Sequence, residues 1–318
     1  KILEKQGQQM KLEIKLLLCG KESSGKSTLF RQIMNLYDNH NDCTAYSKII
    51  QTQLRQNFVP MMQFLSRVKA DIVDEALPLF ERFSKLKTQE ELEYFFIIDN
   101  YEQLTSLAAS ASQFINTHSL QSVIPWNAIY QFQEAPRILQ PTYEATFEDV
   151  LNSKISLKQT AFKVFKQQNR FLRFIMPSEN NIWLKYYQDS QAIVYVVNLD
   201  LFDQKKDEIN LLIEQMREFD EFINKTEFKD CEVILILNKV DRLEIKLTVT
   251  QFSTCILDYK GNNSFEDVSA FIQMKFQRLN KYRKRNIHTI FCNALSQQTV
   301  GGVYKNIVEV VLQSEMKS

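Results

Sequence analysis

The chain has 318 residues, 44% of them hydrophobic, so it is long enough to bury one large core or two ordinary ones. Its 39 lysine and arginine residues balance 38 aspartate and glutamate residues, which excludes a general electrostatic attraction to nucleic acid. The five cysteines form no Cys-x-x-Cys pair and the three histidines are scattered, a pattern typical of free thiols and not of a zinc site.

The sequence lacks both an apolar run long enough to span a bilayer and a signal-peptide pattern. We therefore expect a soluble, cytoplasmic protein, with attachment to the inner face of the plasma membrane left open because the chain begins at Lys1 and a lipid signal could precede it.

Short apolar runs alternate with segments of helical periodicity along most of the chain. This alternation predicts an α/β protein with a three-layer arrangement of helices around a sheet. The predicted strands are 14–19, 161–165, 192–197, 233–237 and 289–292, and the predicted helices include 203–219, 264–279 and 303–312.

The stretch from about residue 45 to residue 140 differs, because it contains no credible strand. Ile50, Leu54, Phe58, Met61, Leu65 and Val68 recur at helical spacing and give one apolar face. We expect an all-helical insertion in which these side chains form a core.

The strongest local motif is a complete G-x-x-x-x-G-K-[ST] phosphate-binding loop between a predicted strand and a predicted helix. Its glycines allow backbone N–H groups to converge on phosphate oxygens, Lys26 is expected to reach the β- and γ-phosphates, and Ser27 to bind Mg²⁺. The motif comprises Gly20, Lys21, Glu22, Ser23, Ser24, Gly25, Lys26, Ser27 and Thr28.

A second motif, Asn-Lys-Val-Asp, directly follows the predicted strand 233–237. The Asp241 carboxylate can accept hydrogen bonds from guanine N1–H and from the 2-amino group, two donors that adenine lacks. Asn238 is expected to fix the surrounding loops and the stem of Lys239 to pack on the base. Together the two motifs predict binding of GDP and GTP.

Several stretches resemble heterotrimeric G-protein α subunits, in the family's order and approximate spacing. The resemblance covers nearly the whole chain except the segment known as switch II. It is carried by residues 15–28, 137–143, 149–151, 238–241, 264–267, 276–281 and 292–295.

The resemblance implies a Ras-like P-loop GTPase domain, formed by residues 1–40 and 141–318, with an all-helical domain inserted at residues 41–140. It also implies that the Ala294 amide binds guanine O6 and that Trp126 and Asn127 stand where the family carries Asp-Ser facing the nucleotide. A G-protein βγ dimer and a membrane receptor are the partners it implies, and no effector can be named.

Switch I departs from the family pattern. Aligning residues 149–151 puts Lys154 at the position of the catalytic arginine, and Lys lacks that residue's planar fork. The Mg²⁺-binding threonine falls at Leu157, and Ser156 or Thr160 could replace it only after a small shift. Lys154 and Thr160 are therefore the candidate catalytic and metal-binding residues.

Switch II departs further. We align the family's Asp-x-Gly-Gly-Gln with residues 166–170, which puts Lys166 in place of the acidic residue and Arg170 in place of the water-orienting glutamine. The sequence has no glycine between Gly25 and Gly261. An incorrect coding sequence between residues 167 and 181 is an alternative explanation.

Glu22 also replaces a glycine of the family, close to where water attacks the γ-phosphate. The sequence therefore predicts a G-protein α-type switch in which GTP hydrolysis is slow or lost. The alternatives are a non-catalytic scaffold held together by guanine nucleotide and, less in keeping with the motif order, a P-loop kinase.

Overall fold

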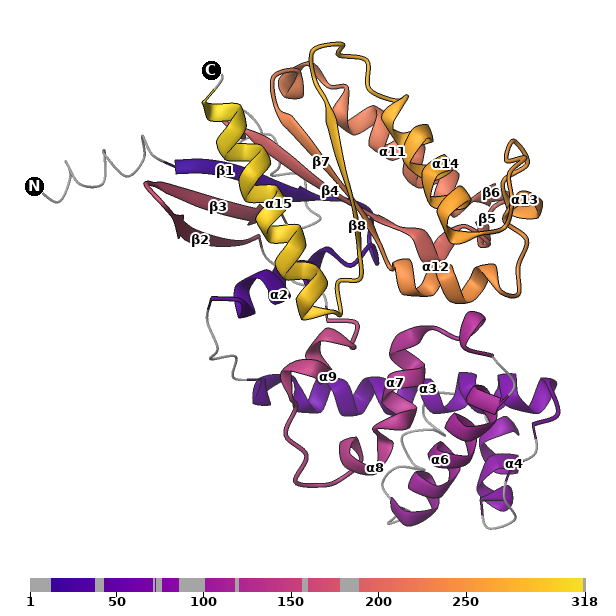
Figure 1. Cartoon of the computed structure of the whole chain (residues 1–318). Coiled ribbons are helices and arrows are strands. Elements are labelled where there is room, and N and C mark those ends of the chain that lie inside the picture. The colour runs from indigo at the N-terminus through magenta and orange to yellow at the C-terminus, as the bar shows by residue number, and fades with distance from the viewer. Residues whose placement is uncertain are drawn as a thin grey trace, which may run out of the picture. The chain divides into compact units, whose positions relative to one another are not determined.

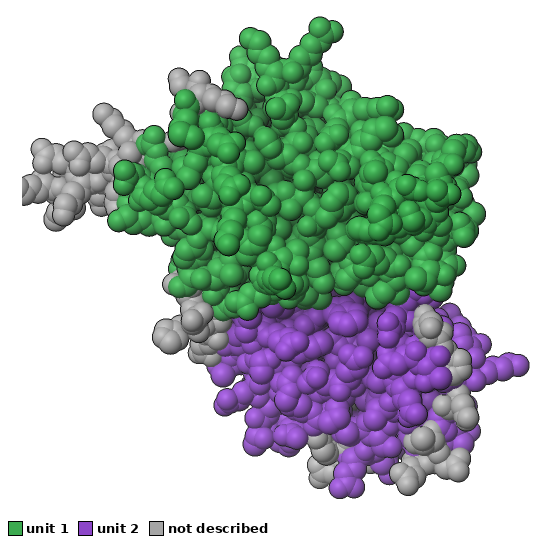
Figure 2. All heavy atoms as spheres, in the orientation of Figure 1, with its two compact units in different colours: residues 1–39, 156–318 green, residues 40–155 purple. Residues whose placement is uncertain are grey.

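The chain divides into two compact units, one of residues 1–39 and 156–318 and one of residues 40–155 (Figure 2). The computed structural model describes residues 13–37, 43–70, 72, 76–85, 101–117, 120–155, 160–177 and 189–316.

The first unit is built on a six-stranded sheet with the strand order β2-β3-β1-β4-β7-β8 (Figure 1). Strands β1, β3, β4, β7 and β8 run parallel, and β2 pairs antiparallel with β3 at one edge. The strands are β1 (Glu13–Cys19), β2 (Ala161–Gln167), β3 (Arg170–Met176), β4 (Ala192–Asn198), β7 (Glu232–Asn238) and β8 (Ile287–Cys292).

Helices cover both faces of this sheet, because its central strands are apolar on both sides. Alternate residues of β1 belong to different cores: Leu16 and Leu18 pack with α2 and α15, whereas Leu17 packs with α11, α12 and α14 (Figure 1). The helices of this unit are α2 (Lys26–Asn35), α11 (Leu211–Ile223), α12 (Val240–Leu247), α13 (Phe252–Cys255), α14 (Phe265–Gln277) and α15 (Gln297–Glu315).

Most of the predicted segments differ by one or more residues from those in the structure. The segment predicted as a helix from residue 203 begins with a small hairpin of β5 (Lys205–Lys206) and β6 (Ile209–Asn210). Helix α11 starts only after it, where the Asn210 side chain accepts hydrogen bonds from the amides of Leu212 and Ile213 at 2.9 and 3.3 Å. Strand β2 and helix α15 are both longer than predicted.

Strand β3 was not predicted at all. It follows β2 through a tight turn at Gln168 and Asn169, with Gln168 in the left-handed region at φ 51°. Such turns are usually marked by glycine, which the turn lacks, and this is why the sequence did not indicate a hairpin. Because β3 pairs with both β1 and β2, residues 170–176 of the doubtful stretch 167–181 are an integral part of the sheet.

The second unit is helical in its described residues. Its helices are α3 (Ser47–Arg67), α4 (Leu77–Lys85), α6 (Tyr101–Thr117), α7 (Trp126–Gln133), α8 (Ala135–Ile138) and α9 (Phe147–Leu151). Five of the six residues of the predicted apolar stripe are buried in its core, whereas Val68, at the C-cap of α3, is 41% exposed. No helix among the described residues of either unit is long and apolar enough to cross a membrane.

The second boundary between the units lies after residue 155, whereas the sequence placed it after residue 140. Residues 141–155 stay with the helical unit because Asp149, on α9, bonds to Arg137 on α8 and to Tyr130 on α7. The boundary at the start of the insertion differs from the predicted one by a single residue.

Helix α15 contains a pair of glycines, Gly301 and Gly302, although a Cβ atom at either position would meet no other atom within 4 Å. Glycine inside a helix costs about 1 kcal/mol relative to alanine. We expect Gly302→Ala to raise the free energy of unfolding by about 0.5–1 kcal/mol, measured by urea denaturation. A destabilised Gly302→Ala protein would contradict the open environment of this residue.

Candidate nucleotide-binding site

The five parallel strands bring their carboxyl ends to one edge of the sheet, and the sequence motifs lie at that edge. In parallel α/β sheets, ligands bind in the crevice outside these strand ends. The phosphate-binding loop follows β1, Asn198 ends β4, Asn238 ends β7, and Ala294 follows β8. Residues predicted from separate stretches of sequence therefore share one edge of the first unit.

Two glycines of the phosphate-binding loop have conformations and surroundings that exclude a side chain. Gly20 has a φ of +134° and Gly25 a φ of +96°. An added Cβ would lie 2.2 Å from the Val196 carbonyl oxygen at Gly20, and 2.1 Å from Asn238 Nδ2 at Gly25. The glycines of the motif are thus required by close packing of the loop against β4 and β7.

The side chains of the loop point in different directions. Lys26 Nζ donates to the carbonyl oxygens of Gly20 and Lys21, at 2.6 Å each, so its ammonium group lies inside the loop. Glu22 and Ser23 are exposed, whereas Ser24 is fully buried. The Ser24 hydroxyl has no hydrogen-bond partner among the described residues, which leaves a polar atom available to a ligand.

Asn238 joins three loops through one buried side chain. Its Nδ2 donates to the Ser24 carbonyl oxygen at 2.8 Å, and its Oδ1 accepts from the Ala294 amide at 3.0 Å. This is the loop-fixing role expected of Asn238. The Ala294 amide, which the resemblance assigns to guanine O6, is thereby engaged with Asn238 in this structure.

Asp241 lies in the first turn of α12 and is the last residue of the Asn-Lys-Val-Asp motif. Lys239 takes the left-handed conformation, with φ 67°, and so turns the chain from β7 into this helix. Burial raises the pKa of the Asp241 carboxyl group. Its Oδ1 is buried with no hydrogen-bond partner among the described residues, so this acceptor is suited to a ligand's N–H group.

The sequence analysis overlooked two residues at the end of β4. Asn198 Nδ2 donates to the Ser23 carbonyl oxygen at 3.2 Å, which supports the loop from the side of β4. Asp200 forms ion pairs with Lys239 at 3.8 Å and with the buried side chains of Arg242 and Lys246 at 3.5 and 3.1 Å. The signal that could have found them is the change from a buried strand to polar residues at 198–200.

Comparison with known protein families shows to which family the chain belongs. The family described as "G-protein alpha subunit" matches residues 1–311. The chain belongs to the G-protein α-subunit family. It is therefore a guanine-nucleotide-binding signalling protein, with a Ras-like GTPase fold and a helical domain, and both the predicted family and the predicted fold class are confirmed.

The sheet topology corrects our placement of switch II. Lys166 pairs with Phe171 and Gln167 with Arg170 in the β2–β3 hairpin, while Glu13 at the start of β1 pairs with Phe171. The hairpin turn therefore lies near the amino end of β1, whereas the phosphate-binding loop follows the carboxyl end of β1. The predicted roles of Lys166 and Arg170 at the γ-phosphate are wrong, because the undetected strand β3 shifted the register.

The carboxyl end of β3, at Met176, lies on the same side of the sheet as the phosphate-binding loop. Because the end of β3 and not that of β2 faces the loop, we propose to align the family's Asp-x-Gly-Gly-Gln with Met176 and the residues Pro177-Ser178-Glu179-Asn180 that follow it. The Ser27 hydroxyl donates to Met176 Sδ at 3.9 Å. Thr160 precedes Ala161, which pairs with Met176, so Thr160 also lies at this edge. Residues 178–180 lie outside the described part of the chain.

Lys154 belongs to the helical unit, and its backbone is held there by one side chain of α3. Gln53 Nε2 donates to the Lys154 carbonyl oxygen at 2.8 Å, and Gln53 Oε1 accepts from the Lys154 amide at 3.2 Å. Nearby, the Trp126 indole donates to Asn152 Oδ1 at 2.7 Å. Ser156 and Leu157, the other switch I candidates, lie outside the described residues.

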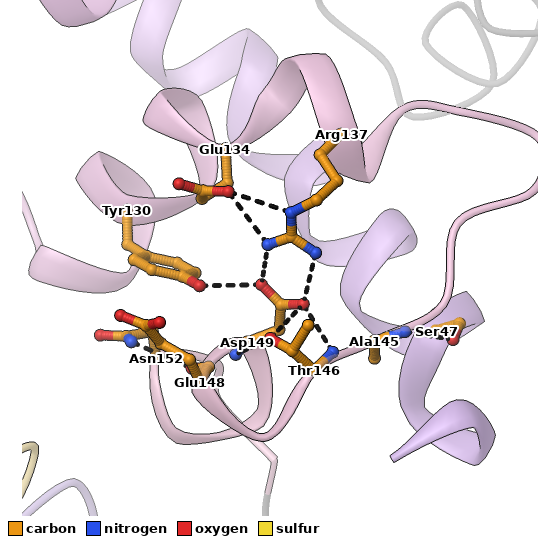
Figure 3. Close-up of polar contacts among 9 residues, drawn as sticks. All are labelled: Ser47, Tyr130, Glu134, Arg137, Ala145, Thr146, Glu148, Asp149 and Asn152. Carbon is orange, nitrogen blue, oxygen red and sulfur yellow. Dashed lines mark hydrogen bonds and ion pairs between the residues drawn. The ribbon is translucent and has the colours of Figure 1, made fainter.

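A network around Asp149 holds the segment that leads to Lys154 (Figure 3). Arg137 donates to both carboxylate oxygens, at 2.6 and 2.9 Å, and the Tyr130 hydroxyl donates at 2.8 Å. Thr146 forms a capping box with Asp149 at the start of α9. Burial alone would raise the pKa of Asp149, but hydrogen bonds from Arg137, Thr146 and Tyr130 lower it to about 2.

We expect Asp149→Ala to lower the free energy of unfolding of the helical unit by about 3 kcal/mol, the lower end of the cost of breaking a buried ion pair, because the Arg137 side chain is 38% exposed. The stabilisation by Asp149 should be complete above its ordinary pKa of 3.8 and disappear as the pH falls through about 2. Urea unfolding at several pH values measures both effects. Glu134→Gln, which alters the more exposed partner of Arg137, serves as the control and should cost less than 1 kcal/mol.

Proposed function

We propose that this G-protein α-type protein binds GDP and GTP with little dependence on Mg²⁺ and hydrolyses GTP slowly or not at all. The observation that carries the proposal is the contact between the Ser27 hydroxyl and the Met176 thioether. In the corrected register, Met176 replaces the carboxylate that holds Mg²⁺ through water in the family.

The described residues fit a guanine nucleotide. Asp241 offers a buried acceptor without a partner for the base, and Ser24 offers a buried hydroxyl in the phosphate-binding loop. Lys26 supplies a positive charge held within that loop. When bound, GTP would supply the β–γ phosphoanhydride bond on which GTPase chemistry acts, and these residues would bind its base and phosphates.

The described residues fit Mg²⁺ less well. Mg²⁺ prefers oxygen ligands in nearly ideal octahedral geometry, and a thioether is a soft ligand that does not suit it. Among the described residues, no group of three or more His, Cys, Asp and Glu side chains could hold a metal ion. Of the predicted metal ligands that the structure describes, Ser27 and Thr160 offer hydroxyl oxygens at this edge, and we assign the metal no step in the reaction.

The positions expected to carry catalysis are also altered. Lys154 keeps the positive charge of the family's arginine but cannot make its bidentate contact. Asn180 takes the place of the water-orienting glutamine, and Glu179 that of a glycine whose amide senses the γ-phosphate. These substitutions in the sequence support slow hydrolysis, because phosphoryl transfer depends on positioning and charge stabilisation.

Single-turnover release of phosphate from bound GTP distinguishes a slow GTPase from a nucleotide-dependent scaffold. Slow but measurable release supports the switch, and none supports the scaffold. Family members in general work with a βγ dimer and a receptor. We extend that partnership, and attachment at the inner face of the plasma membrane, to this chain as part of the proposal.

We expect Asp241→Ala to weaken GDP binding by about 2–4 kcal/mol, because the buried carboxylate is the group that would distinguish guanine from adenine. Isothermal titration with GDP and ADP measures the change. Glu244→Ala, an exposed position on the same helix α12, is the matched control and should bind GDP normally. Equal affinity of the unmodified protein for ADP and GDP would remove the basis for guanine selectivity.

We expect Met176→Asp to raise the affinity for Mg²⁺ by about tenfold or more in the presence of a GTP analogue, because it restores a carboxylate next to Ser27. Rapid hydrolysis should not return, since Lys154, Glu179 and Asn180 are unchanged. The measurement is analogue affinity over a Mg²⁺ titration with chelator as the zero point, and Met176→Leu is the apolar control. If the unmodified protein loses nucleotide on chelation as readily as Met176→Asp, the proposed metal independence is incorrect.

A further inference from the structure

Lys21, the second residue of the phosphate-binding loop, is tied by its side chain to a helix far along the chain. Its Nζ lies 2.5 Å from Glu214 Oε2 and 3.0 Å from Glu218 Oε1. The two glutamates are four residues apart on α11, so they stand on the same face of that helix. Because its ammonium group contacts both carboxylates, the Lys21 side chain is directed to α11.

The backbone of Lys21 carries the contacts that shape the loop. Its carbonyl oxygen accepts from Lys26 Nζ at 2.6 Å and from the Ser24 amide at 3.2 Å. A displacement of Lys21 would therefore also displace the lysine expected to bind phosphate. The ion pairs on the side chain and the hydrogen bonds on the backbone act on the same residue.

Helix α11 also supports the loop by a second route. Gln215 accepts from the Asn198 amide at 2.8 Å and donates to the Asn198 carbonyl oxygen at 3.0 Å, and Asn198 in turn donates to Ser23. The helix itself is anchored in the core by Leu212 and Phe219, both fully buried. It is a rigid reference that holds the loop on both sides of Glu22.

We propose that Lys21, Glu214 and Glu218 form an ionic clamp that positions the phosphate-binding loop and slows the release of bound guanine nucleotide. The clamp rests on the proposed nucleotide binding. Its three members are positioning residues, because Lys21 is held away from direct use on phosphate by the two carboxylates. Each side chain is between 28% and 39% exposed, so the clamp should weaken as salt is added.

The pKa shifts of Lys21 and Glu214 have the directions expected of an ion pair. The hydrogen bond from Lys21 lowers the pKa of Glu214. Burial would lower the pKa of Lys21, but the hydrogen bonds to Glu214 and Glu218 raise it above its ordinary value. Lys21 and Glu214 therefore stay charged at neutral pH.

The test is the rate at which a fluorescent GDP is released when excess unlabelled GDP is added. We expect release to be roughly three to ten times faster in Lys21→Met and in the double variant Glu214→Gln with Glu218→Gln. Lys21→Arg, which can keep both ion pairs, should release nucleotide at nearly the original rate. The difference between the original protein and the two clamp variants should shrink in 1 M KCl, where charges are strongly screened.

Asp220→Asn is the matched control on the same helix, since Asp220 pairs with Lys281 at 3.0 Å and not with the loop. It should leave the release rate unchanged. Thermal unfolding without nucleotide shows whether each variant is folded, and Lys21→Arg keeps the clamp testable if the others are not.

Whether GDP release becomes faster or slower in the glutamate double variant distinguishes two roles of Lys21. If Lys21 bound phosphate directly, removing the two carboxylates would free its charge and slow release, which would overturn the clamp. Release rates equal to the original in both clamp variants would also overturn it while leaving nucleotide binding intact. A protein that bound no guanine nucleotide at all would overturn the clamp together with the proposed function.

Discussion

The carboxamide of Asn238 is the interaction on which the site in the first unit depends. It is buried at the end of β7 and connects the phosphate-binding loop, through Ser24, to the loop after β8, through Ala294. One planar carboxamide at the end of β7 is hydrogen-bonded to both loops. The distance between the two loops is therefore set by the sheet and not by the loops themselves. Gly25 is part of the same constraint, since a side chain there would occupy the space of Asn238 Nδ2.

Around this connection, the electrostatics divide into a base side and a phosphate side. Near the base motif, Asp200 forms ion pairs with Lys239, Arg242 and Lys246, while Asp241 keeps a buried oxygen without a hydrogen-bond partner among the described residues. In the phosphate-binding loop, Lys26 lies inside the loop and Lys21 is held by α11. The two lysines of one loop therefore have different tasks, although they are only five residues apart.

The position of β3 changes how the departures from the family should be understood. With β3 in place, the carboxyl end of β3 and not that of β2 lies at the same end of the sheet as the phosphate-binding loop. In the register that we propose, the substitution that matters for Mg²⁺ is an uncharged one, Met176, instead of the reversed charge that Lys166 had suggested. The proposal that nucleotide binding depends little on Mg²⁺ is unchanged. Its physical cause is now a missing oxygen ligand.

The amino-acid sequence by itself determined the family, the phosphate-binding loop, the base motif and the helical character of the insertion. Each of these depends on residue types at short, fixed spacings, which are legible without knowledge of the fold. The tertiary structure alone revealed strand β3, because the turn at Gln168 and Asn169 lacks the glycine that usually marks a hairpin. It also decided the extent of the helical unit, through the bond between Arg137 and Asp149, and the pairing of Lys21 with α11. These contacts join charged residues from different elements, and only the packing of those elements brings them together.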